Sequence, residues 1–358
     1  MLYRKLHLTR VRASIDPGIQ ARAGAPMNFT KADTQAAFVK RAKEFGLRTF
    51  FPAPVYLEDW MQPNDVTSYV NWAMALLERW RSLGVTPPFY SVLNEPQVAR
   101  NFPAQWLHDV VVQLGQRLRA AGFRTKLVIP DDENPVDAYT RAVAVLQDPG
   151  ARQYVGAVAF HIYRIGSPAD YPRLRALASR YRLPLWMTEY ESPSYDSYRT
   201  AFDWAVKMHQ LLTIGSVNAV DYLWGFFGDW VRTDTLVSMQ FDNGTLRSFA
   251  PTPLYAYMGQ YSKYVLPGYR RVAVSSDDSN VLVSAYTGPK RVVLVATNTS
   301  HDPRPLRIRV PGAGKQAAVI QTTESAPLAP LAPLRLRAKA FQASLPAFSV
   351  TTFVVPRP

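Results

Sequence analysis

The 358-residue sequence contains no cysteine, which excludes structural disulfides and thiolate metal sites and leaves the redox compartment open. No run of eighteen apolar residues occurs, so no membrane span is predicted. Residues 1–5 lack the apolar core of a signal peptide.

Motifs of several enzyme classes are also absent. The five histidines are scattered, and none forms the His-x-x-x-His pair of a helical metal site. No glycine-rich phosphate loop follows a predicted strand, and no Gly-x-Ser-x-Gly elbow offers a serine nucleophile. The sequence therefore predicts no metal and no other cofactor.

Basic residues outnumber acidic residues, 41 to 27, which gives a net charge of +14. They are spread along the chain, without a block of five or six like charges and without a Gly-aromatic RNA-binding signature, so we expect no nucleic-acid partner. A solvated basic surface is the simpler interpretation, and attraction to an acidic polymer or particle surface is the alternative. The hydrophobic content of 47% supports one large and one small domain.

Strand-like and helix-like segments alternate up to about residue 260. The predicted strands are 8–12, 47–51, 89–93, 127–129, 158–160, 183–188 and 219–224. One helix begins at Thr30 with Asp33 as its capping-box partner, and others span 65–83, 104–121, 136–146, 170–181 and 197–214. This alternation predicts a parallel sheet with crossover helices, and seven strands are one fewer than a closed (β/α)8 barrel needs. We expect the missing strand at the front, before Arg10.

The pattern changes after about residue 265, where short β-rich runs are separated by turn signals. They are 281–286, 291–297, 306–310, 317–322 and 350–355, and they predict a small antiparallel β-sandwich. Residues 326–334 repeat Ala-Pro-Leu and predict a stiff, polyproline-like loop. The predicted domains are a catalytic barrel over 1–260 and a sandwich over 261–358.

Two glutamates follow two buried strands. Glu95 stands in Asn94-Glu95-Pro96 after the apolar run 89–93, and Glu189 follows the run 183–188. Strand ends of a barrel meet around one rim, so the two carboxyls can face each other there. Retaining glycoside hydrolysis uses such a pair, and we assign Glu95 as acid/base and Glu189 as nucleophile. Either glutamate alone would carry little weight, because glutamates are common at strand ends.

Other polar and aromatic residues at strand ends could complete a sugar site. Asn94 is expected to donate a hydrogen bond to a sugar hydroxyl, with a loop-capping amide as the alternative. His161 and Tyr163 share one strand end; Tyr163 could orient the nucleophile, and His161 could line the pocket or be a buried core histidine. Trp224 could carry a sugar ring or belong to a core.

Two charged features near strand ends are also interpreted. Arg10, on the first visible strand, is expected to hydrogen-bond Glu189 and keep it ionised, with a plain surface arginine as the alternative. The acidic run 131–133 is interpreted as a turn after a strand.

These motifs together resemble glycoside hydrolase family 30, a family of retaining (β/α)8 enzymes with a β-sandwich. The resemblance covers nearly the whole chain. It rests on Asn94-Glu95-Pro96, on Trp186-Met187-Thr188-Glu189, on His161-Ile162-Tyr163, and on C-terminal segments 255–271, 283–286 and 345–353.

The resemblance implies the acid/base position for Glu95, the nucleophile position for Glu189, and sugar-lining positions for Arg10, Asn94, His161, Tyr163 and Trp224. Family substrates are β-linked and include xylans, β-1,6-glucans and glucosylceramides, and some members release single sugars from chain ends. The expected partner is therefore a β-linked oligosaccharide, polysaccharide or glycolipid. A bell-shaped pH dependence is expected from the two carboxyls.

The sequence departs from the family pattern in three places. The first barrel strand with its Gly-Phe-Gly motif has no counterpart, so a truncated chain is expected, secreted or at the cell surface in its full-length form. Phe51-Pro52-Ala53-Pro54 stands where Ser-Pro-Trp is frequent. After Trp224, the arginines that bind glucuronate in one subgroup are lacking, and Arg232 is out of register, so strict glucuronoxylan specificity is not predicted.

Some alternatives stay open at this point. A carbohydrate-binding protein that has lost turnover, a transglycosylase, and a glucosylceramidase-like or exo-acting enzyme all fit the sequence. The particular glycan and the oligomeric state are not determined by it.

Overall fold

The computed structural model describes residues 1–358 apart from 164–165, 192–197, 229–233, 313 and 358. None of the described helices combines the length and the apolar character that a bilayer crossing requires.

The chain divides into two compact units. The barrel unit comprises Thr9–Tyr190 and Ile214–Tyr222, and the sandwich unit comprises Met1–Leu8, Glu191–Thr213 and Leu223–Pro358. From the sequence we expect a boundary between catalytic barrel and sandwich at residue 260. The two compact units meet at other positions in the chain, so this boundary stays a prediction.

The barrel unit contains seven parallel strands in its described residues. They are β1 (Arg10–Ile15), β2 (Thr49–Pro54), β3 (Phe89–Ser91), β4 (Lys126–Asp132), β5 (Val155–His161), β6 (Leu185–Glu189) and β7 (Ala219–Val220). Strands β1 and β2 form one parallel pair, β3 to β7 form a second parallel sheet in sequence order, and β2 contacts β3. This series matches the predicted barrel strands in number and order.

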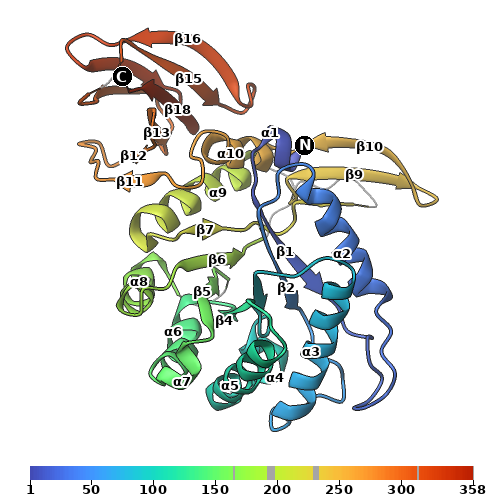
Figure 1. The fold of residues 1–358 in the computed structure, drawn as a ribbon. Coiled ribbons are helices and arrows are strands. Elements are labelled where there is room, and N and C mark those ends of the chain that lie inside the picture. The colour runs from blue at the N-terminus through green and yellow to red at the C-terminus, as the bar shows by residue number, and fades with distance from the viewer. Residues whose placement is uncertain (164–165, 192–197, 229–233, 313, 358) are drawn as a thin grey trace. The chain divides into compact units, whose positions relative to one another are not determined.

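Helices cover the outside of these strands (Figure 1). They are α2 (Thr30–Lys43), α3 (Val66–Ser82), α4 (Pro96–Arg100), α5 (Ala104–Ala120), α6 (Pro135–Leu146), α7 (Pro149–Arg152) and α8 (Tyr171–Arg180), with a 3-10 turn at Pro168–Asp170.

Helix α3 illustrates how local sequence sets these helices. The Asp65 side chain accepts a hydrogen bond from the backbone N–H of Ser68, which caps the first turn, and Gly84 with a φ of +76° follows the last. One face of the helix is apolar and buried, and its Trp80 stacks on Phe50 of β2 with ring centroids 6.4 Å apart. The helix therefore begins and ends where the sequence predicts and covers the outer face of the strands.

The interior of the barrel unit is apolar at one level and polar at the next. Phe51, Val128 and Trp186 form a buried cluster together with Ala157 and Ala159. Because side chains alternate along each strand, His161, two positions beyond Ala159, belongs to the same interior face. Arg12 does so too, because it lies two positions beyond Arg10, whose guanidinium stacks on Trp186. The apolar cluster thus forms the floor on which a layer of polar side chains rests.

The sandwich unit contains helices α1 (Leu2–Lys5), α9 (Tyr198–Gln210) and α10 (Pro253–Ser262). A π-helical turn, Leu211–Gly215, follows α9. A three-stranded sheet, ordered β10-β9-β8, is formed by β8 (Phe226–Phe227), β9 (Val237–Asp242) and β10 (Thr245–Pro251).

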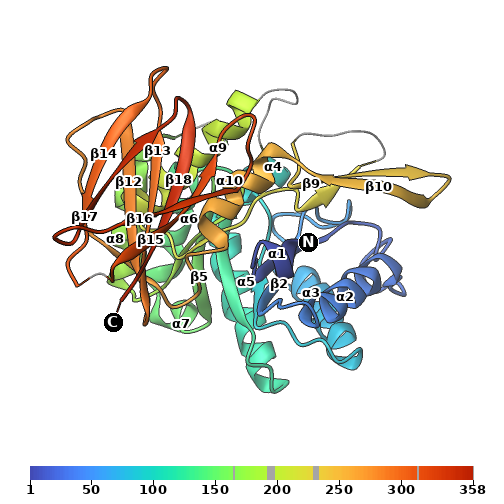
Figure 2. The ribbon, with the colours of Figure 1, turned by 90° about the horizontal axis from the view of Figure 1, so that it is seen from above.

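The C-terminal strands form the predicted antiparallel sandwich (Figure 2). One sheet is ordered β11-β12-β13-β18-β15-β16 and the other pairs β14 with β17. Their apolar side chains form one core that includes Phe341 and Phe353. The strands are β11 (Arg270–Val272), β12 (Val281–Thr287), β13 (Arg291–Asn298), β14 (Arg304–Arg309), β15 (Gln316–Thr322), β16 (Ala329–Arg335), β17 (Ala340–Leu345) and β18 (Ser349–Pro356).

Three local predictions are wrong. The Ala-Pro-Leu repeat at 326–334 is not a polyproline-like loop, because most of it is strand β16, at the edge of its sheet, where proline is tolerated. Asp33 does not complete a capping box; Phe29 is the N-cap of α2, and Asp33 pairs with Arg79 instead. The last barrel strand ends at Val220, not at Trp224.

Candidate active site

Glu95 is held at the rim of the barrel unit by backbone contacts to two neighbouring strands. The N–H of Asn94 donates to the carbonyl of Pro54, and the N–H of Glu95 donates to the carbonyl of Asp131, each at 2.9 Å. Glu95 has a φ of +45° and is followed by Pro96, the first residue of α4. A left-handed glutamate is uncommon, and such backbone strain clusters at functional sites.

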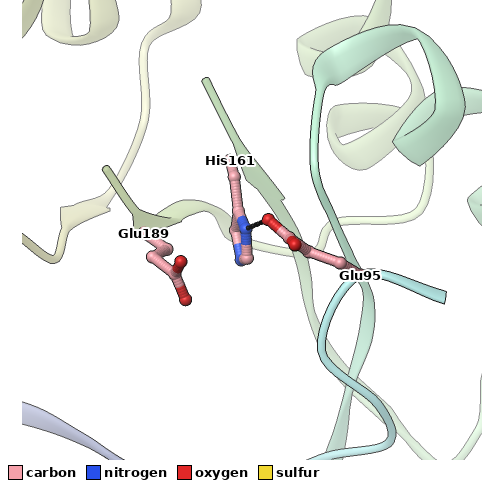
Figure 3. Close-up of side chains that lie close together, drawn as sticks. All are labelled: Glu95, His161 and Glu189. Atoms are coloured by element: carbon pink, nitrogen blue, oxygen red, sulfur yellow. Dashed lines mark hydrogen bonds and ion pairs between the residues drawn. The ribbon is translucent and has the colours of Figure 1, made fainter. Parts of the chain in front are cut away.

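Glu189 ends β6 and lies beside the end of β5. The ladder between these strands pairs Glu189 with His161 after a register shift. One carboxylate oxygen of Glu95, one of Glu189 and one ring nitrogen of His161 all lie within 4.8 Å of one another. Figure 3 shows both carboxylates pointing toward the space around His161. This separation fits a retaining pair, at roughly 5–5.5 Å, and not an inverting pair, at roughly 6.5–9.5 Å.

Both oxygens of Glu189 accept hydrogen bonds. Arg12 donates from Nη1 to Oε2 at 2.7 Å, and Tyr163 donates from its hydroxyl to Oε1 at 3.1 Å. The contact that we expect between Tyr163 and Glu189 is therefore present. The contact predicted for Arg10 is wrong, because Arg12 makes it.

Arg10 lies one step lower in the barrel. Its guanidinium stacks on Trp186 at 4.1 Å from the ring centroid and pairs with Asp221 at 3.0 Å. Arg10 and Arg12 share a face of β1, but Arg12 is nearer the carboxyl end and therefore reaches the rim. The separation of two residues, which places Arg10 and Arg12 on the same face of a strand, was the sequence signal that could have indicated Arg12.

Asp131 joins the polar layer beneath the carboxylates and was missed by the turn interpretation of 131–133. Its side chain is fully buried and accepts hydrogen bonds from Ser91 at 2.6 Å, from Arg12 at 3.0 Å, and from Thr188. Burial alone would raise the pKa of Asp131, but Arg12 and His161 hold it well below its usual range. Asp131 is thus a buried carboxylate anchored by four neighbours.

Arg12 links this anchor to the rest of the site. Its Nη2 donates to Asp131 and also to Oδ1 of Asn94, while its Nη1 binds Glu189. Burial lowers the pKa of Arg12, but the attraction of Asp131 and Glu189 outweighs burial and raises it above its ordinary value. One guanidinium therefore sets the positions of the amide beside Glu95 and of the Glu189 carboxylate.

His161 is the second buried cation of the site. Its Nδ1 lies 2.8 Å from Oε1 of Glu95, and its Nε2 lies 3.4 Å from Oδ1 of Asp131, an ion-pair distance without hydrogen-bond geometry. Burial would lower the pKa of His161, but the attraction of Glu189 and the contacts with Asp131 and Glu95 raise it to about 9. The ring is therefore an imidazolium at neutral pH and donates to Glu95.

A second buried pair fixes the helix that follows Glu95. Arg141 of α6 pairs with Asp132 at 2.8 Å and donates to Gln97 of α4 at 2.6 Å. Burial raises the pKa of Asp132 to about 6, although Arg141 opposes that shift. The neighbours Asp131 and Asp132 thus stabilise different parts of the site. Asp131 binds the polar layer beneath the carboxylates, and Asp132 binds Arg141, which holds the helix after Glu95.

We expect Asp131→Asn to lower the free energy of unfolding by about 3–5 kcal/mol, because it leaves Arg12 and His161 buried without their anion. Urea unfolding at pH 7 measures the change. Asp132→Asn is the matched control, and a smaller loss is expected there because burial raises the pKa of Asp132 to about 6, so its ionised form at pH 7 is disfavoured by the fold. Equal losses in the two variants would contradict the anchoring role of Asp131.

We also expect His161 to make stability depend on pH in the alkaline range. Because its pKa is raised from 6.5 to about 9, its stabilising contribution is complete below about pH 6.5 and is lost as pH rises through 9. The loss amounts to about 3 kcal/mol at roughly 1.4 kcal/mol per pKa unit. Urea unfolding at pH 6, 8 and 9.5 measures it, and His161→Asn should remove it whereas His108→Asn should not. An unchanged pH dependence in His161→Asn would refute this account.

A metal ion does not fit this donor set well. Glu95, His161 and Glu189 are spaced so that they could surround a cation. A protonated imidazole has no lone pair to offer, and the His161 ring is held in that state by three carboxylates. The arrangement better suits two carboxyl groups that act on a substrate between them.

Two predicted features lie elsewhere. Trp224 belongs to the sandwich unit, where its ring packs against Phe227 at 4.7 Å between centroids, so its role under a sugar stays a prediction. Arg232 lies outside the described residues. Within the barrel unit, Tyr163, Tyr190 and Tyr222 form a run of aromatic contacts beside Glu189 that the sequence reasoning missed.

Comparisons with known proteins agree with this geometry. No family model matches the chain. Glucuronoxylanase XynC of Bacillus subtilis (strain 168) is 28% identical over 304 residues, which cover 82% of this chain and 67% of the relative. The crystal structure of the glycoside hydrolase family 30 subfamily 8 xylanase Xyn30A from Clostridium acetobutylicum is 25% identical, with a TM-score of 0.80 over 99% of this chain and 91% of that one. In sequence and in fold, the chain therefore resembles the enzymes of glycoside hydrolase family 30.

The chain is a glycoside hydrolase, with a (β/α)8-type barrel and a C-terminal antiparallel β-sandwich. An endo-β-1,6-glucanase shares its fold at 15% identity, with a TM-score of 0.73 over 99% of this chain and 83% of that one. The family resemblance seen in the sequence is therefore confirmed.

Proposed function

We propose that this enzyme hydrolyses a β-linked glycan of the xylan type by double displacement, with Glu95 as acid/base and Glu189 as nucleophile. The observation that carries the proposal is the approach of the Glu95 and Glu189 carboxylates to within 4.8 Å. The similarity to a glucuronoxylanase and to a xylanase supports the choice of a xylan over other β-glycans.

In the first step Glu189 attacks the anomeric carbon while Glu95 protonates the leaving oxygen. Arg12 and Tyr163 hold Glu189 from two sides, which fixes its direction of attack. His161 donates to Oε1 of Glu95, so that Oε2 is the oxygen left to deliver the proton. The product is a covalent glycosyl-enzyme on Glu189 and a free leaving sugar.

In the second step Glu95, now ionised, takes a proton from a water that attacks the glycosyl-enzyme. The charges of the site suit this exchange: Arg12 and His161 balance Asp131 and Glu189 before the reaction, when Glu95 carries the proton. Once Glu189 is esterified, its negative charge is transferred to Glu95, and the buried layer keeps the same total charge. Two displacements return the β configuration.

Asn94 is placed to contribute to substrate binding. Its Oδ1 accepts from Arg12, which leaves the amide Nδ2 as a donor. We infer that it hydrogen-bonds a hydroxyl of the sugar at the cleaved bond, a contact that strengthens in the transition state.

The test is sugar release from xylan, glucuronoxylan, β-1,6-glucan, β-1,4-glucan and aryl β-glycosides, with the anomeric configuration of the first product followed by NMR. We expect release from the two xylans, with a β product first. An α product would overturn double displacement, and release from a β-glucan alone would overturn the substrate. Binding without release from any substrate, in a folded chain, would favour a carbohydrate-binding protein.

The site of action follows from the substrate. A polysaccharide does not cross membranes, so we propose that the enzyme acts outside the cell or at its surface.

A further inference from the structure

One end of the sandwich unit carries exposed basic side chains from several strands. The segment 303–358 contains eight basic residues and a single acidic one, Glu324, which lies beyond the opposite end of β15. Six exposed residues define the basic end: Lys290, Arg309, Lys315, Arg335, Arg337 and Lys339.

Backbone hydrogen bonds bring these six residues together from distant parts of the sequence. Lys290 accepts at its carbonyl from the N–H of Arg357, and the carbonyl of Pro356 accepts from Gly314, next to Lys315. Lys315 in turn accepts from Leu336, which lies between Arg335 and Arg337.

The remaining members join at the β16–β17 hairpin. Arg337 and Ala340 exchange two backbone hydrogen bonds around a two-residue turn, and the carbonyl of Lys339 accepts from Val310, next to Arg309. Ala338 and Lys339 have φ values of +50° and +64°, a conformation that Asn-Gly normally supplies at such a turn. A lysine therefore occupies the tip of a hairpin where its backbone conformation is unfavourable.

The basic end is free to engage a partner. Among the residues that the structure describes, no ion pair engages any of the six side chains. Four neighbouring strands, β13, β18, β15 and β16, each have one of their two ends here. At roughly 4.8 Å between neighbouring strands, the basic end is about 14 Å wide across them. Charges spread over that distance suit an extended polymer better than one small anion.

We propose that the basic end binds a polysaccharide that carries carboxylate groups and so brings the enzyme onto its polymeric substrate. The inference rests on the proposed function in one respect, that the protein acts on glycans. Carboxylates repeated along such a polymer can pair with arginine and lysine wherever the polymer lies against the basic end. A nucleic acid fits less well, because residues 303–340 contain no aromatic side chain on which a base could stack.

The test measures binding in a chain that cannot cleave. In a Glu189→Gln background, affinity for glucuronoxylan is compared with affinity for the same polymer after its carboxyls have been reduced to alcohols. The basic-end variant carries Arg335→Gln, Arg337→Gln and Lys339→Gln. The matched control removes three exposed cations of the barrel unit by Lys31→Gln, Lys40→Gln and Arg48→Gln.

We expect the basic-end variant to bind glucuronoxylan about 10-fold more weakly at low salt, since one exposed ion pair changes a binding constant by roughly 1.5- to 5-fold. The control should bind like the parent, and the difference should shrink as added salt shortens the screening length. Carboxyl-reduced polymer should bind the basic-end variant and the control equally.

Equal affinity of the two triple variants for glucuronoxylan would overturn the proposal, as would an equal loss on the carboxyl-reduced polymer. A basic-end variant that loses affinity only for single-stranded RNA would overturn it in favour of a nucleic acid. Circular dichroism and urea unfolding confirm that both variants are folded. Because binding is read without cleavage, a wild type that binds glucuronoxylan through this end but cleaves no glycan would overturn the proposed function alone.

Discussion

Glu189→Gln should reduce glycan hydrolysis by roughly 10⁴- to 10⁶-fold, the range seen when members of a covalent catalytic unit are removed from a hydrolase. Glutamine keeps the shape of the side chain but cannot form the glycosyl ester. Arg12 would then have one anion fewer, so a modest loss of stability accompanies the loss of activity. Sugar release from xylan by wild type and variant measures the effect.

Glu78→Gln is the matched control for this prediction, because Glu78 is exposed on α3. It should retain wild-type activity. A second variant, Glu189→Gly, opens space at the reacting carbon, so added azide should restore turnover of an aryl β-glycoside and give the α-glycosyl azide. Residual activity within 10-fold of wild type in Glu189→Gln would rule out Glu189 as the nucleophile.

Glu95→Gln should have an effect that depends on the leaving group. Protonation of the leaving oxygen contributes roughly 10²- to 10⁴-fold, and a sugar leaving group needs it whereas a dinitrophenolate does not. We therefore expect a loss of that size on xylan. On a dinitrophenyl β-glycoside the first step should proceed and the second should slow, because no base activates the water.

The measurement for Glu95→Gln is rapid-mixing kinetics together with mass spectrometry. A burst of dinitrophenolate and a mass increase of one glycosyl unit on the peptide containing Glu189 are the expected results. The same fractional loss on both substrates, without an accumulated intermediate, would show that Glu95 is not the acid/base. Because His161 contacts one Glu95 oxygen, circular dichroism and urea unfolding check that the variant is folded.

The two glutamates could be predicted because their positions depend on local sequence. Each follows a buried apolar run, and strand ends of a parallel barrel meet at one rim whatever the details of packing. Tyr163 followed from the same reasoning, since it lies just beyond the end of the strand that carries His161.

Arg12 and Asp131 show where that reasoning fails. Arg10 and Arg12 share one face of β1, and only the height of the strand in the barrel decides which guanidinium reaches Glu189 and which stacks on Trp186. Asp131 appears in a run of acids that a turn would explain equally well. Its four partners lie on four other strands, so neither they nor its burial can be seen in a local sequence pattern.

The Ala-Pro-Leu repeat failed for a related reason. Its composition favours a polyproline-like loop, and no local feature indicates a strand. Pairing with β15 at the edge of the sheet supplies the missing stabilisation, because only one side of β16 needs hydrogen-bond partners.

The sequence by itself determined the order of strands and helices, the sandwich that follows them, the two carboxylates and the resemblance to glycoside hydrolase family 30. These depend on apolar periodicity and on strand ends, which are properties of short segments. The tertiary structure alone decided the 4.8 Å approach of the carboxylates, the choice of Arg12 over Arg10, the buried charge on Asp131 and His161, and the gathering of six cations at one end of the sandwich. Each of these is a contact between residues far apart in the chain, and its energy depends on distances and burial that only the folded protein sets.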